Sequence, residues 1–214
     1  MKRPNVLKLS ADNSTVVGVT NKNVTYISIP NCVKTIGPGA FQGCRNLKSV
    51  YIPDSVTTIQ PAAFYRCSSL ESIDIPDSVT KIGDSAFEGC SALENIDIPS
   101  GVITIEPSVF KYCSALECVH IPDRVKVIAS FAFIGCSSLK LIHIPNSVTS
   151  ICNGAFMWCS SLESIDIPNS VIHIGEGAFN GCFRLKDIHI HSGTCLTNIP
   201  YQIFGNNTNI IIEK

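Results

Sequence analysis

Residues 68–90 read SSLESIDIPDSVTKIGDSAFEGC, and nearly the same string returns at residues 160–182 as SSLESIDIPNSVIHIGEGAFNGC. The two strings begin 92 residues apart, which is four times 23, and three looser copies fill the interval. A fixed period between about 20 and 50 residues is the sequence signature of a repeat protein. The chain is therefore predicted to be an array of 23-residue units.

Four residue types keep this register over seven units without an insertion. In the unit that begins at Ser68 they are Leu70, Pro76, Phe87 and Cys90. One unit cannot bury its apolar side chains by itself, so neighbouring units must stack to close a core. The cysteines of the series are Cys44, Cys67, Cys90, Cys113, Cys136, Cys159 and Cys182.

Each unit is predicted to form one coil of a solenoid. Residues 70–75 alternate apolar and polar side chains, which predicts a short strand of a parallel sheet. Pro76 ends the strand because it has no N–H to donate. Residues 79–82 turn the chain. Residues 84–90 are predicted to form a short capped helical turn, which ends at Gly89 because glycine readily adopts the left-handed conformation.

The pattern L-x-x-I-x-I-P-x-S-V-x-x-I-G-x-x-A-F-x-G-C resembles the BspA-like (Treponema pallidum type) leucine-rich repeats. The resemblance covers about residues 24–205 and rests on proline, phenylalanine and cysteine as well as leucine. It implies an α/β repeat solenoid of right-handed coils with a parallel β-sheet and short helical turns. It also implies protein binding, with adhesin-like contact to host matrix or cell-surface proteins, and a location at the cell surface or outside the cell.

Both ends of the chain depart from the repeat, as terminal repeats do when they cover an exposed core. Residues 1–23 are predicted to be an N-terminal cap, with a hairpin-like arrangement around the polar residues 20–23. Residues 24–190 form the repeat array. Residues 191–214 are predicted to be a C-terminal half-repeat with a capping strand in the sequence NIIIEK.

Composition excludes several classes of partner. The net charge of −1 provides no basic excess for binding nucleic acid. No apolar run reaches the 18 residues of a membrane span, and the N-terminal sequence does not have the pattern of a signal peptide. No cofactor, phosphate-binding loop or nucleophile with a base beside it is indicated, so an enzyme is not expected.

The eleven cysteines of the chain invite a disulfide or zinc interpretation. The seven cysteines in register would stand about 4.8 Å apart, too far for disulfides, and a straight column offers no tetrahedral site for zinc. We therefore predict a buried, reduced column in which cysteine fills space as a small apolar residue. Bridges remain possible among Cys32, Cys118, Cys152 and Cys195, and many free thiols favour a reducing cytoplasm.

The outward columns of the predicted sheet are one candidate binding surface. Eight acidic residues against three lysines give these columns a net charge of −5. His120 and His143 on adjacent coils, between Asp97 and Asp166, suggest an alternative metal- or pH-responsive site. The candidate residues are Tyr51, Asp74, Asp97, Cys118, His120, Leu141, His143, Asp166 and His189.

The outer turns are a second candidate surface, because several units carry large side chains where others have small or polar ones. Exposed apolar patches mark interaction sites, and aromatic residues, methionine and arginine are enriched in interface cores. The same side chains could instead fold back over the neighbouring coil, and both interpretations stay open. The residues are Tyr65, Arg66, Tyr112, Ile134, Met157 and Trp158.

The sequence therefore predicts a non-catalytic, protein-binding repeat scaffold without a cofactor. The alternatives are the metal- or pH-responsive module and an intracellular structural or interaction protein.

Overall fold

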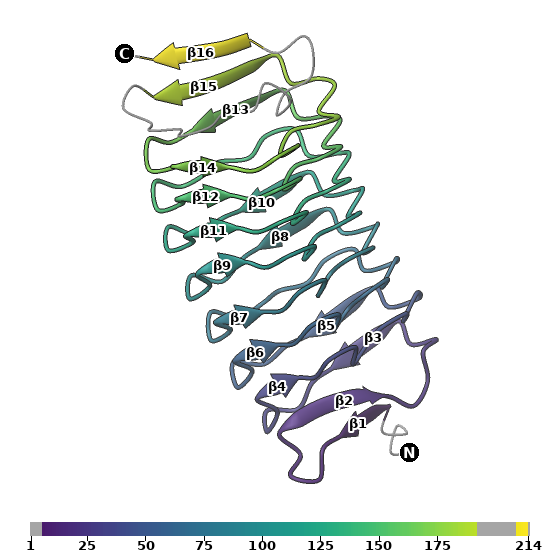
Figure 1. Cartoon of the computed structure of the whole chain (residues 1–214). Helices are drawn as coiled ribbons and strands as arrows, with labels where there is room; N and C mark the ends of the chain where they lie inside the picture. Colours follow the sequence, from purple (N-terminus) through teal and green to yellow (C-terminus); the bar gives the residue numbers. More distant parts are fainter. Residues whose placement is uncertain (1–5, 192–208, 214) are drawn as a thin grey trace.

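The computed structural model describes residues 6–191 and 209–213. The chain winds into coils that stack along one axis, from a hairpin at the N-terminal end to strand β16 at the other (Figure 1). Each complete coil contributes a short strand to the second of two ladders, most coils also contribute one to the first, and a tight turn region lies on the remaining side. The predicted solenoid with parallel strands and a 23-residue period is confirmed.

One ladder contains the alternating segment of each unit, and we call its outward side the sheet face. Over most of its length, paired residues are 23 apart, as Tyr26 with Ser49 and Cys118 with Asn95. The strands are β3 (Tyr26–Ser28), β5 (Ser49–Tyr51), β8 (Asn95–Asp97), β10 (Cys118–His120), β13 (Ser164–Ile167), β15 (Asp187–His191) and β16 (Asn209–Glu213).

The sheet face is less continuous than the sequence predicts. Residues 72–75 and 141–144 align with strands of neighbouring units, yet neither segment forms ladder pairs in the described part of the chain. The first interruption lies between β5 and β8 and coincides with two surface depressions, which share Asp74 and Ile75. The repeat pattern fixes which side chains point inward there but does not guarantee that the backbones pair.

The second ladder continues from β2 of the N-terminal hairpin through a two-residue strand in each unit, and it is interrupted between β7 and β9. Its strands also pair in parallel, as in Ile128 with Ile105 and Ile151. The strands are β2 (Thr15–Val19), β4 (Thr35–Ile36), β6 (Thr58–Ile59), β7 (Lys81–Ile82), β9 (Thr104–Ile105), β11 (Val127–Ile128), β12 (Ser150–Ile151) and β14 (His173–Ile174).

The predicted helical turn at residues 84–90 is wrong, and no helix occurs among the residues that the structure describes. An α-helix requires successive N–H groups to bond four residues back. Here Ala86 and Glu88 donate three residues back within their own coil, whereas the intervening Phe87 donates to Val109 of the next coil at 2.9 Å. The segment is therefore a run of overlapping β-turns whose alternate N–H groups bind the neighbouring coil.

The N-terminal hairpin also differs from the prediction. Strand β1 (Leu7–Leu9) pairs antiparallel with β2, so the hairpin turn lies at residues 10–14 rather than 20–23. The Asp12 carboxylate accepts hydrogen bonds from the Ser14 N–H and hydroxyl, and Asn13 adopts a φ of 58°. An aspartate that binds the backbone two residues on is a strong turn signal. The domain boundaries at residues 23 and 190 stay predictions.

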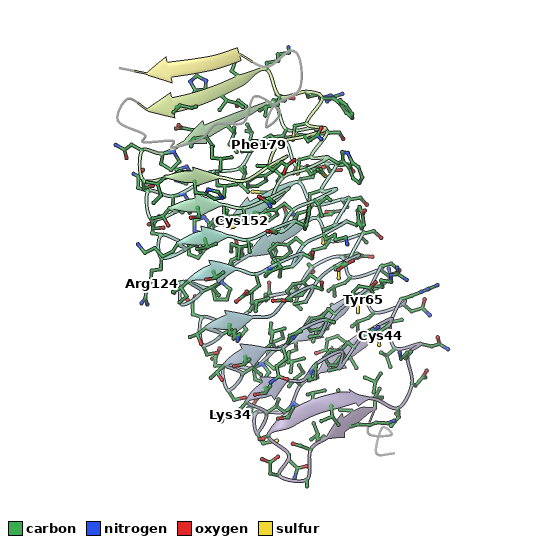
Figure 2. The ribbon with its side chains drawn as sticks, in the orientation of Figure 1. Lys34, Cys44, Tyr65, Arg124, Cys152 and Phe179 are labelled. Atoms are coloured by element: carbon green, nitrogen blue, oxygen red, sulfur yellow. The ribbon has the colours of Figure 1, made fainter. Side chains whose placement is uncertain are left out.

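A column of stacked phenylalanines forms the centre of the core. Seven rings, from Phe41 to Phe179, lie in the interior with neighbouring centroids 5.1–5.8 Å apart. Figure 2 shows side chains filling the space inside the coils, with Phe179 inside and Tyr65 and Arg124 at opposite edges. All seven rings are buried, and the five from Phe64 to Phe156 have a neighbouring ring over each face.

The cysteine column is buried, as predicted, and it does more than fill space. The ten cysteines that the structure describes are free thiols, and Cys195 lies outside the described residues. The Cys90 thiol donates to the Phe64 carbonyl of the preceding coil at 3.2 Å, and that carbonyl also accepts the Cys67 N–H. The thiols from Cys67 to Cys182 repeat this contact, so each one bonds two coils together.

We expect Phe110→Ala to lower the free energy of unfolding by about 3–5 kcal/mol, the usual cost of deleting a buried aromatic side chain. The Phe110 ring is 1% exposed and stacks between Phe87 and Phe133. Guanidinium unfolding followed by circular dichroism would measure the change. Phe183→Ala is the matched control, since that ring is 85% exposed. Equal midpoints for the two variants would contradict the stacked core.

The cysteine column should also make the fold sensitive to alkaline pH. Burial raises the pKa of the Cys67 and Cys182 thiols to about 12, and it raises the pKa of Cys113 further in the same direction. A thiol in the unfolded chain has a pKa of about 8.5, so this stabilisation is complete below pH 8.5 and is lost as pH rises toward the folded-state pKa.

The free energy of unfolding should therefore fall above about pH 8.5, and Cys113→Ala should lessen the slope by up to about 1.4 kcal/mol per pH unit. Denaturant midpoints between pH 7 and 9.5 would measure both slopes. Cys118→Ala is the control because that thiol is exposed. Identical slopes for wild type and Cys113→Ala would show that the buried thiol does not contribute.

Candidate functional site

The sheet face displays most of the residues that the sequence nominates. The side chains of Tyr51, Asp74, Asp97, Cys118, His120, Leu141, His143 and Asp166 are exposed, and only His189 is half-buried. The inward neighbours in the same strands, such as Ile96 and Val119, are buried. Strand alternation therefore places these side chains in a row along one side of the solenoid.

The charge of the sheet face is unevenly compensated. Lys48 pairs with Glu71 on the next coil at 3.0 Å, and Lys140 pairs with Glu117 at 3.5 Å. Within the described residues no ion pair involves Asp74 or Asp97, which occupy the same column on successive coils. The N-terminal half of the face thus carries uncompensated negative charge.

Two depressions lie side by side in this half of the sheet face. One of about 450 Å³ is lined by Tyr26, Tyr51, Asp54 and Asp74, among others. The second, of about 220 Å³, shares Asp74 and extends to Asp97. We call the two together the tyrosine–aspartate trough. The two tyrosines are 54% and 53% exposed, so their rings are available to a ligand.

Tyr26 was not among the sequence candidates, although the repeat register could have found it. It lies 23 residues before Ser49 and pairs with that residue in the ladder. Extending the sheet columns one unit toward the N-terminus therefore places Tyr26 on the exposed side.

The geometry gives no support to the metal-binding alternative. His120 and His143 lie on successive coils of one column, as the sequence indicates. Among the residues with described side chains, however, no group of three or more His, Cys, Asp or Glu side chains could hold a metal ion. Side chains of a sheet project in parallel rather than converging, which is unsuitable for a metal site.

On the turn surface, the sequence candidates divide into three groups. The side chains of Arg66, Tyr112 and Trp158 are exposed, and Tyr65 and Met157 are half-buried. Ile134 is 7% exposed and belongs with the core, so the candidates do not form one continuous exposed patch.

Phe131 is an exposed aromatic residue that the sequence reasoning missed. It is 40% exposed and has a φ of 60°. In the other units this position holds only glycine, alanine or serine, so a phenylalanine there was a signal in the sequence. We use the name aromatic ridge for Tyr112, Phe131 and Trp158.

The aromatic ridge is built on backbone positions that normally favour glycine. Tyr112 and Trp158 have φ values of 58° and 60°, in the left-handed region. Each such residue costs about 1–2 kcal/mol relative to the ordinary conformation. The register position of Tyr112 alternates between glycine and a large residue along the array: Gly43, Arg66, Gly89, Tyr112, Gly135, Trp158 and Gly181.

The alternation has a steric cause, because each large side chain lies over the glycine of the next coil. A Cβ atom at Gly135 would stand 2.5 Å from Tyr112 Cδ1, and one at Gly181 would overlap the Trp158 indole. Outer packing, one of the two interpretations left open by the sequence, therefore occurs. The rings are nevertheless 44% and 49% exposed, so packing covers only part of each.

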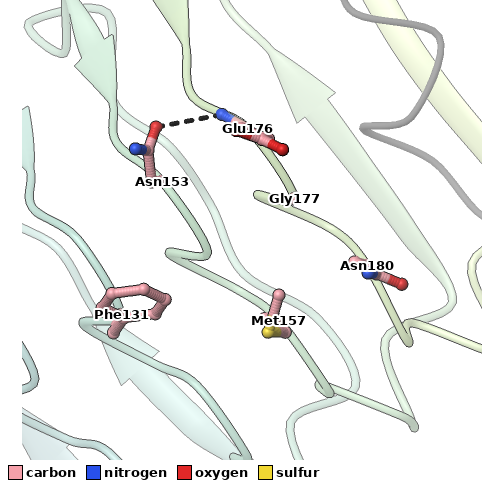
Figure 3. A pocket seen from close by; sticks show the side chains of 6 residues that line it. All are labelled: Phe131, Asn153, Met157, Glu176, Gly177 and Asn180. Carbon is pink, nitrogen blue, oxygen red and sulfur yellow. Dashed lines mark hydrogen bonds between the residues drawn. The ribbon is translucent and has the colours of Figure 1, made fainter.

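A shallow depression of about 300 Å³ adjoins the aromatic ridge. Phe131 and Met157 line it together with the polar side chains of Asn153, Glu176 and Asn180 (Figure 3). The Asn153 side-chain oxygen accepts a hydrogen bond from the Glu176 N–H at 3.0 Å, which ties two coils together.

The stacked coils, the two parallel ladders and the inward column of leucines define a leucine-rich repeat solenoid. The family described as the BspA type leucine rich repeat region, with 6 copies, matches residues 19–140 and 126–212. The chain belongs to this family. Among curated proteins, no sequence matches the chain.

Solved structures agree with this assignment. A leucine-rich repeat protein of Treponema pallidum, TpLRR, is 30% identical with a TM-score of 0.76, and the match covers 86% of this chain and 89% of that one. A leucine-rich repeat protein of Eubacterium ventriosum is 28% identical with a TM-score of 0.76. That match covers 94% of this chain but only 52% of the Eubacterium protein.

A third similar structure is the pneumococcal vaccine antigen PcpA, at 19% identity and a TM-score of 0.51, which shows likeness of fold alone. The match covers 90% of this chain and 68% of PcpA. No helix in the described residues is long and apolar enough to cross a membrane.

We expect Gly135→Ala to destabilise the fold by about 1–2 kcal/mol, because Gly135 has a φ of 74° and lies beneath the Tyr112 ring. Tyr112→Gly removes the ring, so it should relieve the overlap with the new Cβ atom at position 135 but not the backbone strain at the φ of that position. The two changes should therefore couple by at least about 0.5 kcal/mol in a double-mutant cycle of denaturant unfolding. Gly18→Ala is the control, because a Cβ there meets only ordinary contacts at 3.9–4.0 Å. Strict additivity would argue against the packing.

Proposed function

We propose that this chain is a non-catalytic scaffold that binds proteins through its sheet face, in an adhesin-like role at a microbial surface. The observation that carries the proposal is the separation between a repeated interior and a varied exterior. The inward positions of the sheet hold valine, isoleucine and leucine in every coil, whereas the outward positions hold tyrosine, aspartate, histidine, cysteine and leucine. Core packing determines the residue types at the inward positions. It does not determine those at the outward positions, which can therefore serve recognition.

The exposed composition of the sheet face supports a protein partner. Tyr51 and Leu141 are 53% and 62% exposed, and tyrosine is among the residues enriched in interface cores. Tyr51 lies in β5, which pairs with β3 and so holds this side chain on a regular backbone. A preorganised surface reduces the entropy lost on binding. The surface location and the host or cell-surface nature of the partner rest on the family resemblance.

The aromatic ridge supports a second binding surface of the same scaffold. Its residues combine a left-handed backbone with a ring that is 40–49% exposed. Glycine at the same position would avoid both the backbone strain and the exposure of an apolar ring to water. Strain of this kind persists mainly where it has a use, and exposed aromatic side chains are favoured in interfaces. The aromatic ridge is therefore the alternative recognition surface to the sheet face.

The proposal is tested by capture of purified host matrix and cell-surface proteins on immobilised protein. The test variant changes Asp74, Asp97, His120 and His143 to serine. We expect at least one protein to be retained by the wild type and lost by this variant, because the four exposed side chains lie in one column of the sheet face.

Two matched variants locate the binding. Ile103→Ser combined with Ile172→Ser removes exposed apolar side chains away from both surfaces and should leave capture unchanged. Tyr112→Gly combined with Trp158→Gly removes two ridge rings while keeping a residue that tolerates their φ values. Loss of capture in the second variant alone would move recognition to the ridge. Failure of the wild type to retain any protein would refute the binding role.

A further inference from the structure

The tyrosine–aspartate trough combines two aromatic rings with several carboxylates in two adjoining depressions. Tyr26 comes from β3 and Tyr51 from β5, which lie side by side near the N-terminal end (Figure 1). Asp54 and Asp74 line the same depression, and Asp97 lines the next. Tyr51, Asp74 and Asp97 occupy one column on successive coils.

The charge in and around the trough is negative and is not neutralised from within the described chain. The nearby cation in the adjacent column, Lys48, already pairs with Glu71. Glu94, on the coil after Glu71 in that column, adds a further exposed carboxylate that makes no ion pair with the described residues. A ligand that complements the trough must therefore carry positive charge.

The mixture of rings and carboxylates narrows the ligand further. A cation over a tyrosine face is attracted by the ring, and arginine does this more often than lysine. The planar guanidinium also binds carboxylates through two parallel hydrogen bonds and stacks on aromatic faces, whereas an ammonium group acts as a point charge. A hollow that offers both contacts at once suits arginine.

The trough crosses an interruption of the ladder, since residues 72–75 form no ladder pairs in the described chain. It also spans successive coils, so a ligand that follows it must be extended rather than compact.

We propose that the tyrosine–aspartate trough binds arginine side chains of an exposed, extended basic segment of a protein partner. This inference rests on the proposed protein-binding function and names the chemistry of the partner. The rings of Tyr26 and Tyr51 hold the guanidinium faces, and Asp54, Asp74 and Asp97 accept its hydrogen bonds.

The test uses fluorescein-labelled hexa-arginine as the probe, with hexa-lysine and the uncharged hexa-citrulline as comparisons, in anisotropy titrations of the whole chain. We expect hexa-arginine to bind more tightly than hexa-lysine and hexa-citrulline not to bind. Tyr51→Ala combined with Asp74→Asn should weaken hexa-arginine by about tenfold or more, the effect of losing about 1.4 kcal/mol. Both side chains are exposed, so the fold should survive, and circular dichroism checks this.

Glu163→Gln is the matched control, since it removes one exposed negative charge of the same face away from the trough. Binding by this variant should stay within about twofold of the wild type, because a distant exposed charge is screened by salt. If both variants weakened hexa-arginine binding equally, the loss of affinity would reflect the net charge of the protein alone, and the proposal would be overturned. Equal binding of hexa-arginine and hexa-lysine, or no binding of either, would overturn it as well.

The two proposals fail in different ways. If the capture experiment retains a partner through the sheet face but hexa-arginine does not bind, the arginine assignment fails and the scaffold function stands. If no protein is captured, the protein-binding function fails whatever the peptide titration shows, and the assignment to a protein partner fails with it.

Discussion

The structure depends on one constraint: the interior of a coil is complete only when an identical interior lies above and below it. The phenylalanine stack shows this most directly, because the two faces of the Phe87 ring are covered by Phe64 of the preceding coil and Phe110 of the following coil. The thiol of each cysteine in the buried column, from Cys67 to Cys182, likewise donates to a carbonyl of the preceding coil. A unit longer or shorter than 23 residues would displace every later contact by the same amount, which explains why the period has no insertion over seven units.

The sequence predicts the interior well because translation along the axis determines it. Once the period is known, alternation around Ile73 identifies the inward residues, and the parallel register follows from pairing equivalent positions. The turn region was predicted less well. Asp84, Ser85 and Gly89 have the local chemistry of a capped helix, but Phe87 donates its N–H to the next coil, and this bond between coils prevails over the helical alternative.

The candidate surfaces could be predicted only in part, and the reason differs between them. On the sheet face, outward side chains follow from alternation, so the nominated residues are exposed except for the half-buried His189, and Tyr26 was missed only because its column was not extended. On the outer turns the alternation rule of a strand does not apply, because left-handed residues redirect the chain. Ile134 is consequently buried whereas Phe131, three residues earlier, is exposed. The position of the trough depends on where the strands of the ladder do not pair, and no residue pattern predicts that interruption.

The alternation of glycine with large side chains along the outer turns also bears on how such an array can lengthen. Tyr112 needs Gly135 beneath its ring, so a bulky unit tolerates only a glycine unit as its following neighbour. Duplication of a single bulky unit would place two large side chains in succession, and the second would supply the Cβ that the first cannot accommodate. Duplication of two adjacent units together preserves the alternation. This part of the array can therefore lengthen without a steric overlap by pairs of coils, twice the structural period.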